Sequence, residues 1–177
     1  MKILGIDQGI ASMGYCILNV SGKEKEIIEY GQISTYPDED DDKMCERIVC
    51  IVNLLEGIIA EFEPDRICCE KLFFNSPQQN GRNKSASIVN TNIASGLIMY
   101  CAGKNEITFI DYPPPTVKKK ITGTGKAQKE DVRKHVLKMY PELIGEEKKM
   151  TEHMIDAVAI ATASFLIDGD IVEEIVE

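Results

Sequence analysis

The stretch Lys2-Ile-Leu-Gly-Ile-Asp7-Gln-Gly9 carries a carboxylate at the end of a short apolar run. An apolar run of this length, bounded by a glycine turn, is typical of a buried strand. Such a strand would deliver Asp7 to the edge of a sheet. A second stretch, Asp65-Arg-Ile-Cys-Cys-Glu70, has the same form and predicts a second strand that ends in an acid.

Short connections join the first strand to two further predicted strands, Met13 to Val20 and Glu26 to Ser34, so these three form an antiparallel meander. A helix is predicted from about Asp42 to Phe62, because apolar residues recur there at helical spacing. A strand, a long helix and another strand make a crossover. The strand ending at Glu70 should therefore lie parallel to the first.

The second half of the chain predicts one more strand among helices. A polar loop over residues 72–87 should precede a helix from about Ala86 to Ala102 and a strand from Glu106 to Tyr112. Three helices follow, the first to Ile121, the second from Gln128 to Met139, and the third capped by Thr151 and running to about Ile167. The expected fold is α/β, with a five-stranded mixed sheet of three antiparallel strands and then parallel strands, flanked by helices. Residues 1–167 should form one domain and residues 168–177 an acidic tail.

Length and composition are those of a globular domain. The chain has 177 residues, and no apolar run approaches the roughly 18 residues of a membrane span. Met1 to Leu4 is too short an apolar segment for a signal peptide, so the expected location is the cytoplasm. The six cysteines show no paired zinc spacing and predict reduced, mostly buried thiols.

The net charge of −9 conceals a basic segment. The five acids from Asp38 to Asp42 and the five after Ile167 together carry more negative charge than the net charge of the whole chain. Between Lys118 and Lys134, seven lysines and arginines stand against two acids. Affinity for a phosphate backbone depends on where the cations lie, so this segment is a candidate nucleic-acid surface.

Ligands in α/β sheets gather at the carboxyl ends of parallel strands, where Asp7 and Glu70 are predicted to lie. Asp156 sits in the apolar helical stretch Met154-Ile-Asp-Ala-Val-Ala-Ile-Ala161, and His153 precedes it by one turn on the same face. Neighbouring carboxylates repel unless a cation lies between them, and magnesium is the ordinary oxygen-liganded cation. Two such ions about 4 Å apart can hold both the attacking and the leaving oxygen of a phosphodiester displacement.

Each of these residues has a simpler explanation when taken alone. An Asp before a glycine is usually a turn residue, a Glu at the end of a strand is usually solvated, and a His–Asp pair on one helix face is usually local. The combination favours a metal site, in which His153 is either a ligand or a general base.

Four blocks of the sequence resemble, in order, the signatures of RuvC-type Holliday-junction resolvases, which are crossover junction endodeoxyribonucleases. The resemblance runs from Met1 to about Leu166 and rests on Lys2-Ile-Leu-Gly-Ile-Asp7-Gln-Gly-Ile-Ala11 with Gly14-Tyr15, Cys69-Glu70-Lys-Leu-Phe-Phe74, Tyr112-Pro-Pro-Pro-Thr-Val-Lys118-Lys-Lys-Ile-Thr-Gly123 with Gly125-Lys-Ala-Gln-Lys129, and His153-Met-Ile-Asp156-Ala-Val-Ala-Ile-Ala161. The order of predicted elements is also that of a ribonuclease H-like fold.

The resemblance implies a homodimer that binds a four-way DNA junction and makes paired nicks, with two Mg²⁺ or Mn²⁺ ions in each active site. It also implies a branch-migration motor as a further partner. By position, the family's metal-binding quartet is Asp7, Glu70, His153 and Asp156. Lys118 and Lys129 match lysines that contact phosphate, and Phe73 matches an aromatic residue that stacks on junction bases. Phe74, Arg82, Lys84 and Lys119 are further DNA-binding candidates. The helix that bears Ile88, Ile93 and Leu97 is expected either to make the dimer contact or to pack in the core.

The sequence also departs from the pattern of the family. His153 stands where most members have a third aspartate, Gln8 replaces the usual proline, and the loop after Phe74 is longer. These departures predict a divergent, phage-like branch with a wider range of branched DNA substrates. The alternatives are a broader branched-DNA or RNA nuclease of the same fold, a non-catalytic DNA-binding descendant, and an actin-like nucleotide-binding module. The last would need a second Asp-x-Gly phosphate turn, which the sequence lacks.

Overall fold

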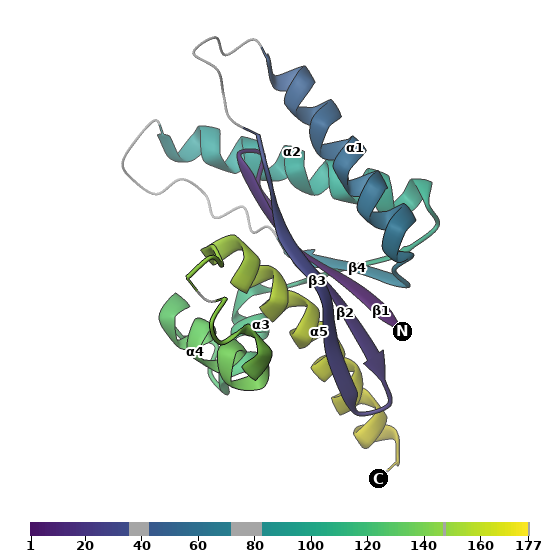
Figure 1. Cartoon of the computed structure of the whole chain (residues 1–177), viewed down its shortest axis with the longest axis vertical. Coiled ribbons are helices and arrows are strands. Elements are labelled where there is room, and N and C mark those ends of the chain that lie inside the picture. The colour runs from purple at the N-terminus through teal and green to yellow at the C-terminus, as the bar shows by residue number, and fades with distance from the viewer. Residues whose placement is uncertain (36–42, 72–82, 147, 177) are drawn as a thin grey trace.

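The computed structural model describes residues 1–35, 43–71, 83–146 and 148–176, without the side chains of 83–87 and 170–176. Five strands and five α-helices lie within these ranges (Figure 1). In chain order the elements are β1 (Lys2–Asp7), β2 (Ser12–Ser21), β3 (Glu24–Ser34), α1 (Met44–Phe62), β4 (Arg66–Glu70), α2 (Asn83–Lys104), β5 (Thr108–Tyr112), α3 (Pro114–Thr122), α4 (Lys129–Met139), the 3₁₀ turn η2 (Pro141–Leu143) and α5 (Glu152–Val176).

The strands form one sheet in the order β3-β2-β1-β4-β5. β1 pairs antiparallel with β2, and β2 with β3, whereas β4 lies parallel to both β1 and β5. The predicted mixed sheet is therefore confirmed. Each parallel pair is connected by a crossover that contains a helix. α1 lies in the connection from β1 to β4, and α2 lies in the connection from β4 to β5.

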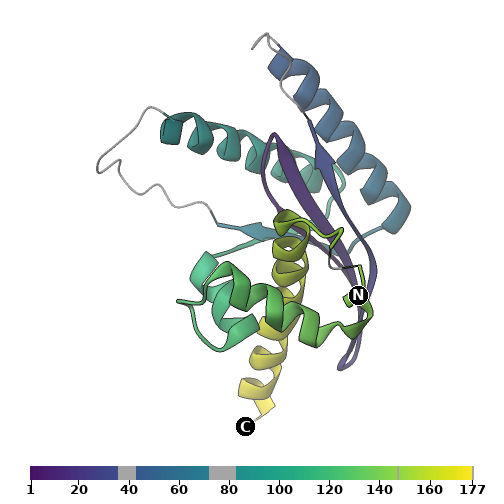
Figure 2. The same ribbon diagram turned by 60° about the vertical axis from the view of Figure 1, so that its left-hand side comes forward.

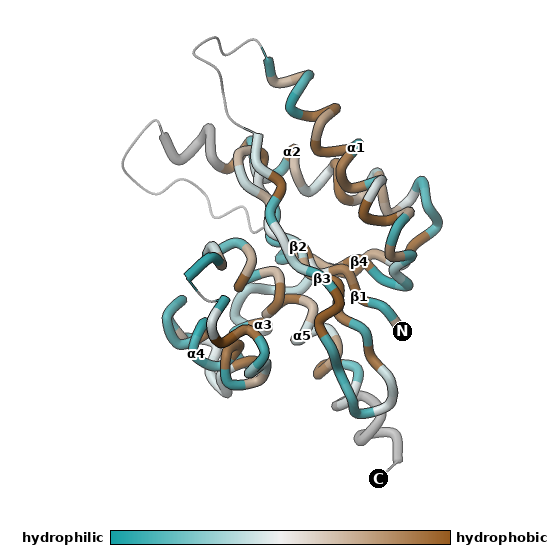
Figure 3. The backbone as a smooth tube through the Cα atoms, viewed as in Figure 1, coloured by the Kyte–Doolittle hydropathy of each residue, from teal (hydrophilic) through white to brown (hydrophobic). Residues whose placement is uncertain are grey.

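Helices cover both faces of the sheet (Figures 1 and 2). Alternate residues of a strand point to opposite faces, so Ile3 packs with α3, α4 and α5, whereas Leu4 and Ile6 pack with α1 and α2. Figure 3 shows hydrophobic residues along the middle of the sheet and hydrophilic residues at the tip of the β2–β3 hairpin. In the described part of the chain, no helix has the length and apolar character needed to cross a bilayer.

All six cysteines are free thiols, as predicted. Cys16, Cys68, Cys69 and Cys101 are buried, whereas Cys45 and Cys50 are exposed on α1. Burial raises the pKa of Cys69 to about 12, and it raises the pKa of Cys16 and of Cys68 further. Because a thiol reacts and ligates as the thiolate, these three groups are structural.

Two helix boundaries differ from the prediction by more than two residues. α2 begins at Asn83, inside the stretch predicted as a loop, because polar residues suit the first turns of a helix as well as a loop. α5 continues to Val176, so its predicted end at Ile167 is wrong. Arg66 of β4 donates hydrogen bonds to Ser164 Oγ at 3.1 Å and to Asp168 Oδ2 at 2.7 Å, which ties the helix to the sheet at this point.

α5 lies unusually close to β1 and β2. A Cβ atom at Gly5 would come within 2.5 Å of the Ala157 carbonyl oxygen and 2.7 Å of the Ala161 nitrogen. At Gly14 it would collide with the carbonyl oxygen of His153. The two glycines therefore allow helix backbone to rest directly on strand backbone.

Gly5→Ala should lower the free energy of unfolding by about 1–3 kcal/mol, because α5 must move away from β1 to accommodate the methyl group. Gly57→Ala is the matched control. Gly57 is exposed on α1 with open space around it, and alanine there should stabilise by about 0.5–1 kcal/mol. Urea unfolding midpoints measure both changes, and equal midpoints for the two variants would contradict the close contact.

Candidate active site

The two strand-terminal acids lie at one edge of the sheet. Asp7 is the last residue of β1, and Glu70 is the last residue of β4. The parallel register that pairs Ile6 with Cys69 makes these acids the next residues on adjacent strands. Their carboxylates therefore leave the sheet side by side, as the sequence predicts.

α5 brings the other two candidates to this edge. His153 Nδ1 lies 2.6 Å from Asp7 Oδ2, and the exposed fractions of the two side chains are 44% and 19%. The hydrogen bond to Asp7 raises the pKa of His153, although partial burial opposes the rise. The imidazole therefore stays a cationic donor to Asp7 at a higher pH than a free histidine would.

The carboxyl groups of this cluster are difficult to ionise together. Burial, followed by the charges of Asp7 and Asp156, raises the pKa of Glu70 to about 7. Burial and the charge of Asp7 raise the pKa of Asp156 to about 6. Near neutral pH, the cluster thus holds more negative charge than its surroundings stabilise.

Carboxylate oxygens with one imidazole are a donor set that suits a hard divalent cation, and the excess negative charge favours such an ion. No three His, Cys, Asp or Glu side chains of residues 1–35, 43–71, 88–146 and 148–169 already surround a common point. Because Asp7 is engaged with His153, binding requires these side chains to turn toward the ion.

Two lysines adjoin the acids. Lys129, at the start of α4, places Nζ 2.8 Å from Glu152 Oε2 and 3.9 Å from Asp156 Oδ2. Lys118 on α3 acts with Lys129 against the burial and the neighbouring acids that raise the pKa of Glu70. An open cavity of about 210 Å³ lies beside Asp156 and is lined by Lys129, Glu130, Arg133, Glu152, Ile155 and Asp156. Acids that can hold metal thus meet cations that can hold phosphate.

The family model for the crossover junction endodeoxyribonuclease RuvC matches residues 3–164. The chain belongs to this family. It is similar to RuvC of Natranaerobius thermophilus, with 34% identity over 136 residues, covering 77% of this chain and 78% of the relative. With RuvC of Caldicellulosiruptor saccharolyticus it shares 31% identity over 173 residues, or 97% and 96% of the two chains.

A structure of Thermus thermophilus RuvC aligns with a TM-score of 0.75 and 25% identity, over 96% of both chains. The same protein in complex with a Holliday junction substrate gives a TM-score of 0.78 at 24% identity, covering 95% of this chain and 94% of that one. The predicted ribonuclease H-like fold is thus confirmed. RuvC enzymes are divalent-metal-dependent endodeoxyribonucleases that resolve Holliday junctions, and this chain is one of them.

The structure describes only some of the other DNA-binding candidates of this RuvC-family chain. Phe73, Phe74 and Arg82 lie outside the described residues. Lys84 falls within α2, where its side chain is not described, and Lys119 is exposed on α3 beside Lys118.

The sequence analysis did not identify Gln8 as a contact between the two acid-bearing strands. Gln8 is buried, and its Nε2 donates to the backbone oxygen of Glu70 at 2.6 Å. A side-chain hydrogen bond thus joins the ends of β1 and β4 just beyond the last backbone pair. The only signal in the sequence was the departure from proline at this position, and it carried no indication of a partner.

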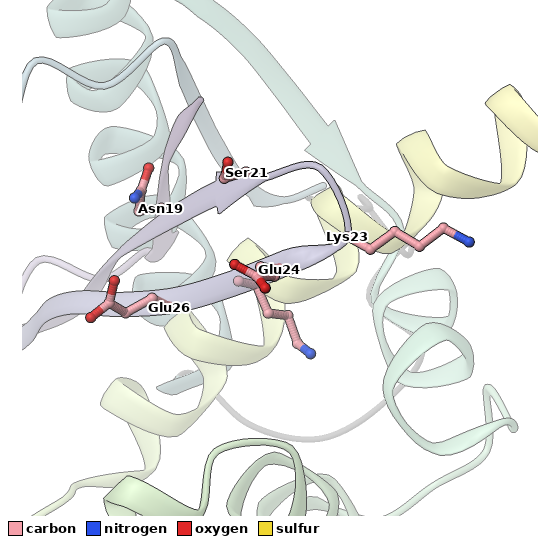
Figure 4. Close-up of a pocket in the computed structure, with 6 residues that line it drawn as sticks. Asn19, Ser21, Lys23, Glu24 and Glu26 are labelled. Atoms are coloured by element: carbon pink, nitrogen blue, oxygen red, sulfur yellow. The ribbon is translucent and has the colours of Figure 1, made fainter.

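A larger cavity, of about 470 Å³, lies at the β2–β3 hairpin (Figure 4). Lys2 pairs with Asn19 and Asp7 pairs with Gly14, so the hairpin is at the opposite end of β1 from the acids. Lys23 and Glu26 point away from each other in Figure 4 and do not converge on a ligand. The acidic edge therefore remains the candidate active site of this RuvC-family chain.

In the absence of metal, Glu70→Gln should raise the melting temperature at about pH 8 by a few degrees. Folding raises the pKa of Glu70 from 4.5 to about 7, so the folded state binds more protons than the unfolded state in the window between these two pKa values, which lies below pH 8. Stability contributed by this group therefore falls as the pH rises through the window, and the amide removes the loss.

The gain should disappear near pH 4, where Glu70 is protonated in the folded protein. Glu61→Gln, at an exposed position on α1, is the control and should change little at either pH. Thermal unfolding in chelator measures both. A Glu70→Gln variant that melts at or below the wild-type temperature at about pH 8 would contradict the charge crowding.

Proposed function

We propose that Asp7, Glu70, His153 and Asp156 are the catalytic and metal-binding residues of this junction endonuclease, and that they hold two Mg²⁺ or Mn²⁺ ions. The observation that carries the proposal is the mutual charge of the acids. Each of Glu70 and Asp156 has its pKa raised by burial and by Asp7, although the three come from β1, β4 and α5. A cluster of buried acids whose negative charge is not neutralised lowers the stability of the folded protein, and a structural role does not explain it.

When bound, divalent cations would activate the attacking water and stabilise the departing oxygen of the phosphodiester. Asp7 and Glu70 would hold them from neighbouring strands, and Asp156 would do so from α5. His153 already donates Nδ1–H to a carboxylate and has a raised pKa, which supports a ligand or orienting role over that of a general base.

Lys118 and Lys129 would hold the phosphate next to the scissile bond, since both act electrostatically on Glu70. Lys119 and Lys84 would contact the backbone farther along the DNA. The proposed roles of Phe73, Phe74 and Arg82, stacking on bases and binding phosphate, rest on the resemblance alone. A branch-migration motor that presents the junction is the further partner we propose.

The enzyme should nick a synthetic four-way junction in the presence of Mg²⁺ or Mn²⁺. Chelator and the Asp7→Asn substitution should each abolish the nicks, and Lys129→Ala should slow them about 10²-fold, as expected for loss of a cation that stabilises the transition state. The control is Lys23→Ala, which removes the same charge at the hairpin tip (Figure 4) and should keep the wild-type rate.

The same assay should include a linear duplex of the same arms, a flap and an RNA–DNA hybrid. Nicks confined to the junction would support strict junction selectivity. Comparable rates on flaps or hybrids would instead favour the broader nuclease, and full activity of Asp7→Asn would contradict the assignment of the site.

We also propose that the enzyme is a homodimer that associates through the outer face of α2, which would place two active sites on one junction. Of the three apolar residues expected at this contact, Ile93 and Leu97 pack against the core, and only Ile88 is exposed. Among the residues of α2 whose side chains are described, the exposed large apolar ones are Ile88, Val89, Met99 and Tyr100, with exposed fractions of 45% to 56%. Gly96 lies on the same helix with open space around it, which permits close approach of a second helix.

Tyr100→Glu should convert the dimer into a monomer, because it places a charge within the proposed contact at its most exposed apolar residue. Ile144→Glu is the matched control. Ile144 is 63% exposed and directly follows η2, whose Leu143 packs in a different core cluster from α2, so its variant should stay dimeric.

Light scattering measures the mass of each variant in solution. Cleavage of a cruciform plasmid shows whether the nicks are paired. Paired nicks produce linear plasmid, whereas a monomer should accumulate nicked circles. A dimeric Tyr100→Glu variant that still yields linear plasmid would place the contact elsewhere.

A further inference from the structure

The start of α5 is tied to the far edge of the sheet through one amide. Thr151 Oγ1 donates to Gln32 Oε1 at 2.6 Å, although 119 residues separate the two in the chain. Gln32 Nε2 in turn donates to Ser34 Oγ at 2.8 Å and to Ser12 Oγ at 3.3 Å. Gln32 therefore links β2, β3 and the first turn of α5.

Thr151 also caps the helix that it ties to the sheet. Thr151 Oγ1 accepts from the backbone N–H of Met154 at 3.3 Å, which is the cap that the sequence predicts for this helix. The single hydroxyl proton of Thr151 is then available for Gln32 Oε1, and the two amide protons of Gln32 face the serine oxygens. Every donor of the Gln32 side chain has a partner, so the amide is held from both ends.

This network fixes the half of the active site that the sheet does not carry. His153 and Asp156 follow Thr151 by two and five residues, within the first turns of α5. Helix ends tend to fray, because the first N–H groups have no partner within the helix. At Gly14 the backbone of β2 touches the carbonyl of His153, which sets the distance of the helix from the sheet. The Gln32–Thr151 contact fixes where along the sheet the helix begins.

We propose that Gln32 and Thr151 are positioning residues of the active site, which set His153 and Asp156 against Asp7 at the spacing needed to bind divalent metal. The inference rests on the proposed function, since it requires these three residues to act as one metal site. Sites of this kind tolerate misplacement of only about 0.5 Å. Neither Gln32 nor Thr151 needs to touch the metal or the DNA.

The test measures Mn²⁺ binding in the absence of DNA, by calorimetry, alongside urea unfolding. Thr151→Val keeps the shape of the side chain but removes the hydroxyl, and Gln32→Leu removes the amide. Both should weaken Mn²⁺ binding about tenfold or more. Thr151→Ser retains the hydroxyl and should restore affinity to within about twofold of the wild type.

Thr162→Val is the matched control. Thr162 lies on the same helix, and its Oγ1 is 2.7 Å from the hydroxyl of Tyr140, a buried contact of the same kind. It is also more than one turn beyond Asp156. The control should lower the urea midpoint by an amount similar to Thr151→Val and leave Mn²⁺ affinity unchanged.

Wild-type affinity in Thr151→Val would overturn the inference, as would an equal loss of affinity in Thr162→Val. Asp7→Asn separates this result from the proposed function. If Asp7→Asn loses Mn²⁺ binding while Thr151→Val keeps it, the metal site stands and only the positioning role fails. If Asp7→Asn binds Mn²⁺ as the wild type does, the metal site fails, and the positioning role with it.

Discussion

α5 reaches the sheet only because Gly5 and Gly14 lack side chains. That contact of helix backbone on strand backbone determines how close the residues of α5 come to the acids at the candidate active site. The loss of Cβ atoms on β1 and β2 lets His153 approach Asp7 to hydrogen-bonding distance. A layer of ordinary apolar side chains would hold the helix at the larger separation that packed layers normally have, and Asp156 would then lie farther from Asp7 and Glu70.

The same proximity crowds negative charge at the candidate active site. Three acids from three elements meet in a partly buried place, where burial and repulsion between the carboxylates favour the protonated forms of Glu70 and Asp156. His153, Lys118 and Lys129 offset part of this charge, and the raised pKa values show that the remainder is not offset. A protein whose stability alone was at stake would gain from replacing one acid with an amide. A metal-dependent enzyme can use such uncompensated charge to attract the ion.

Much of this arrangement follows from the sequence. The strands of β1 and β4 and the acids that end them are local patterns, and the parallel crossover places Asp7 beside Glu70. The sequence also places His153 and Asp156 on one helix face. It could not place Gln32 or Gln8, because each acts through a partner distant in the chain, Thr151 for one and Glu70 for the other. No periodicity marks such contacts. The end of α5 was misjudged for the same reason, since Arg66 on β4 holds the turn at Asp168.

The ion pair between Lys129 and Glu152 has a consequence for how the enzyme responds to salt. Both side chains are well exposed, at 65% and 71%, and their charged atoms are 2.8 Å apart. A DNA phosphate that binds Lys129 as proposed competes with Glu152, and the displaced carboxylate then attracts a cation from solution. Counterions released from the DNA are thus partly recaptured by the protein. The affinity of this lysine for the junction should accordingly vary less steeply with ionic strength than that of an unpaired lysine, because the acidic neighbour takes up part of the released counterions.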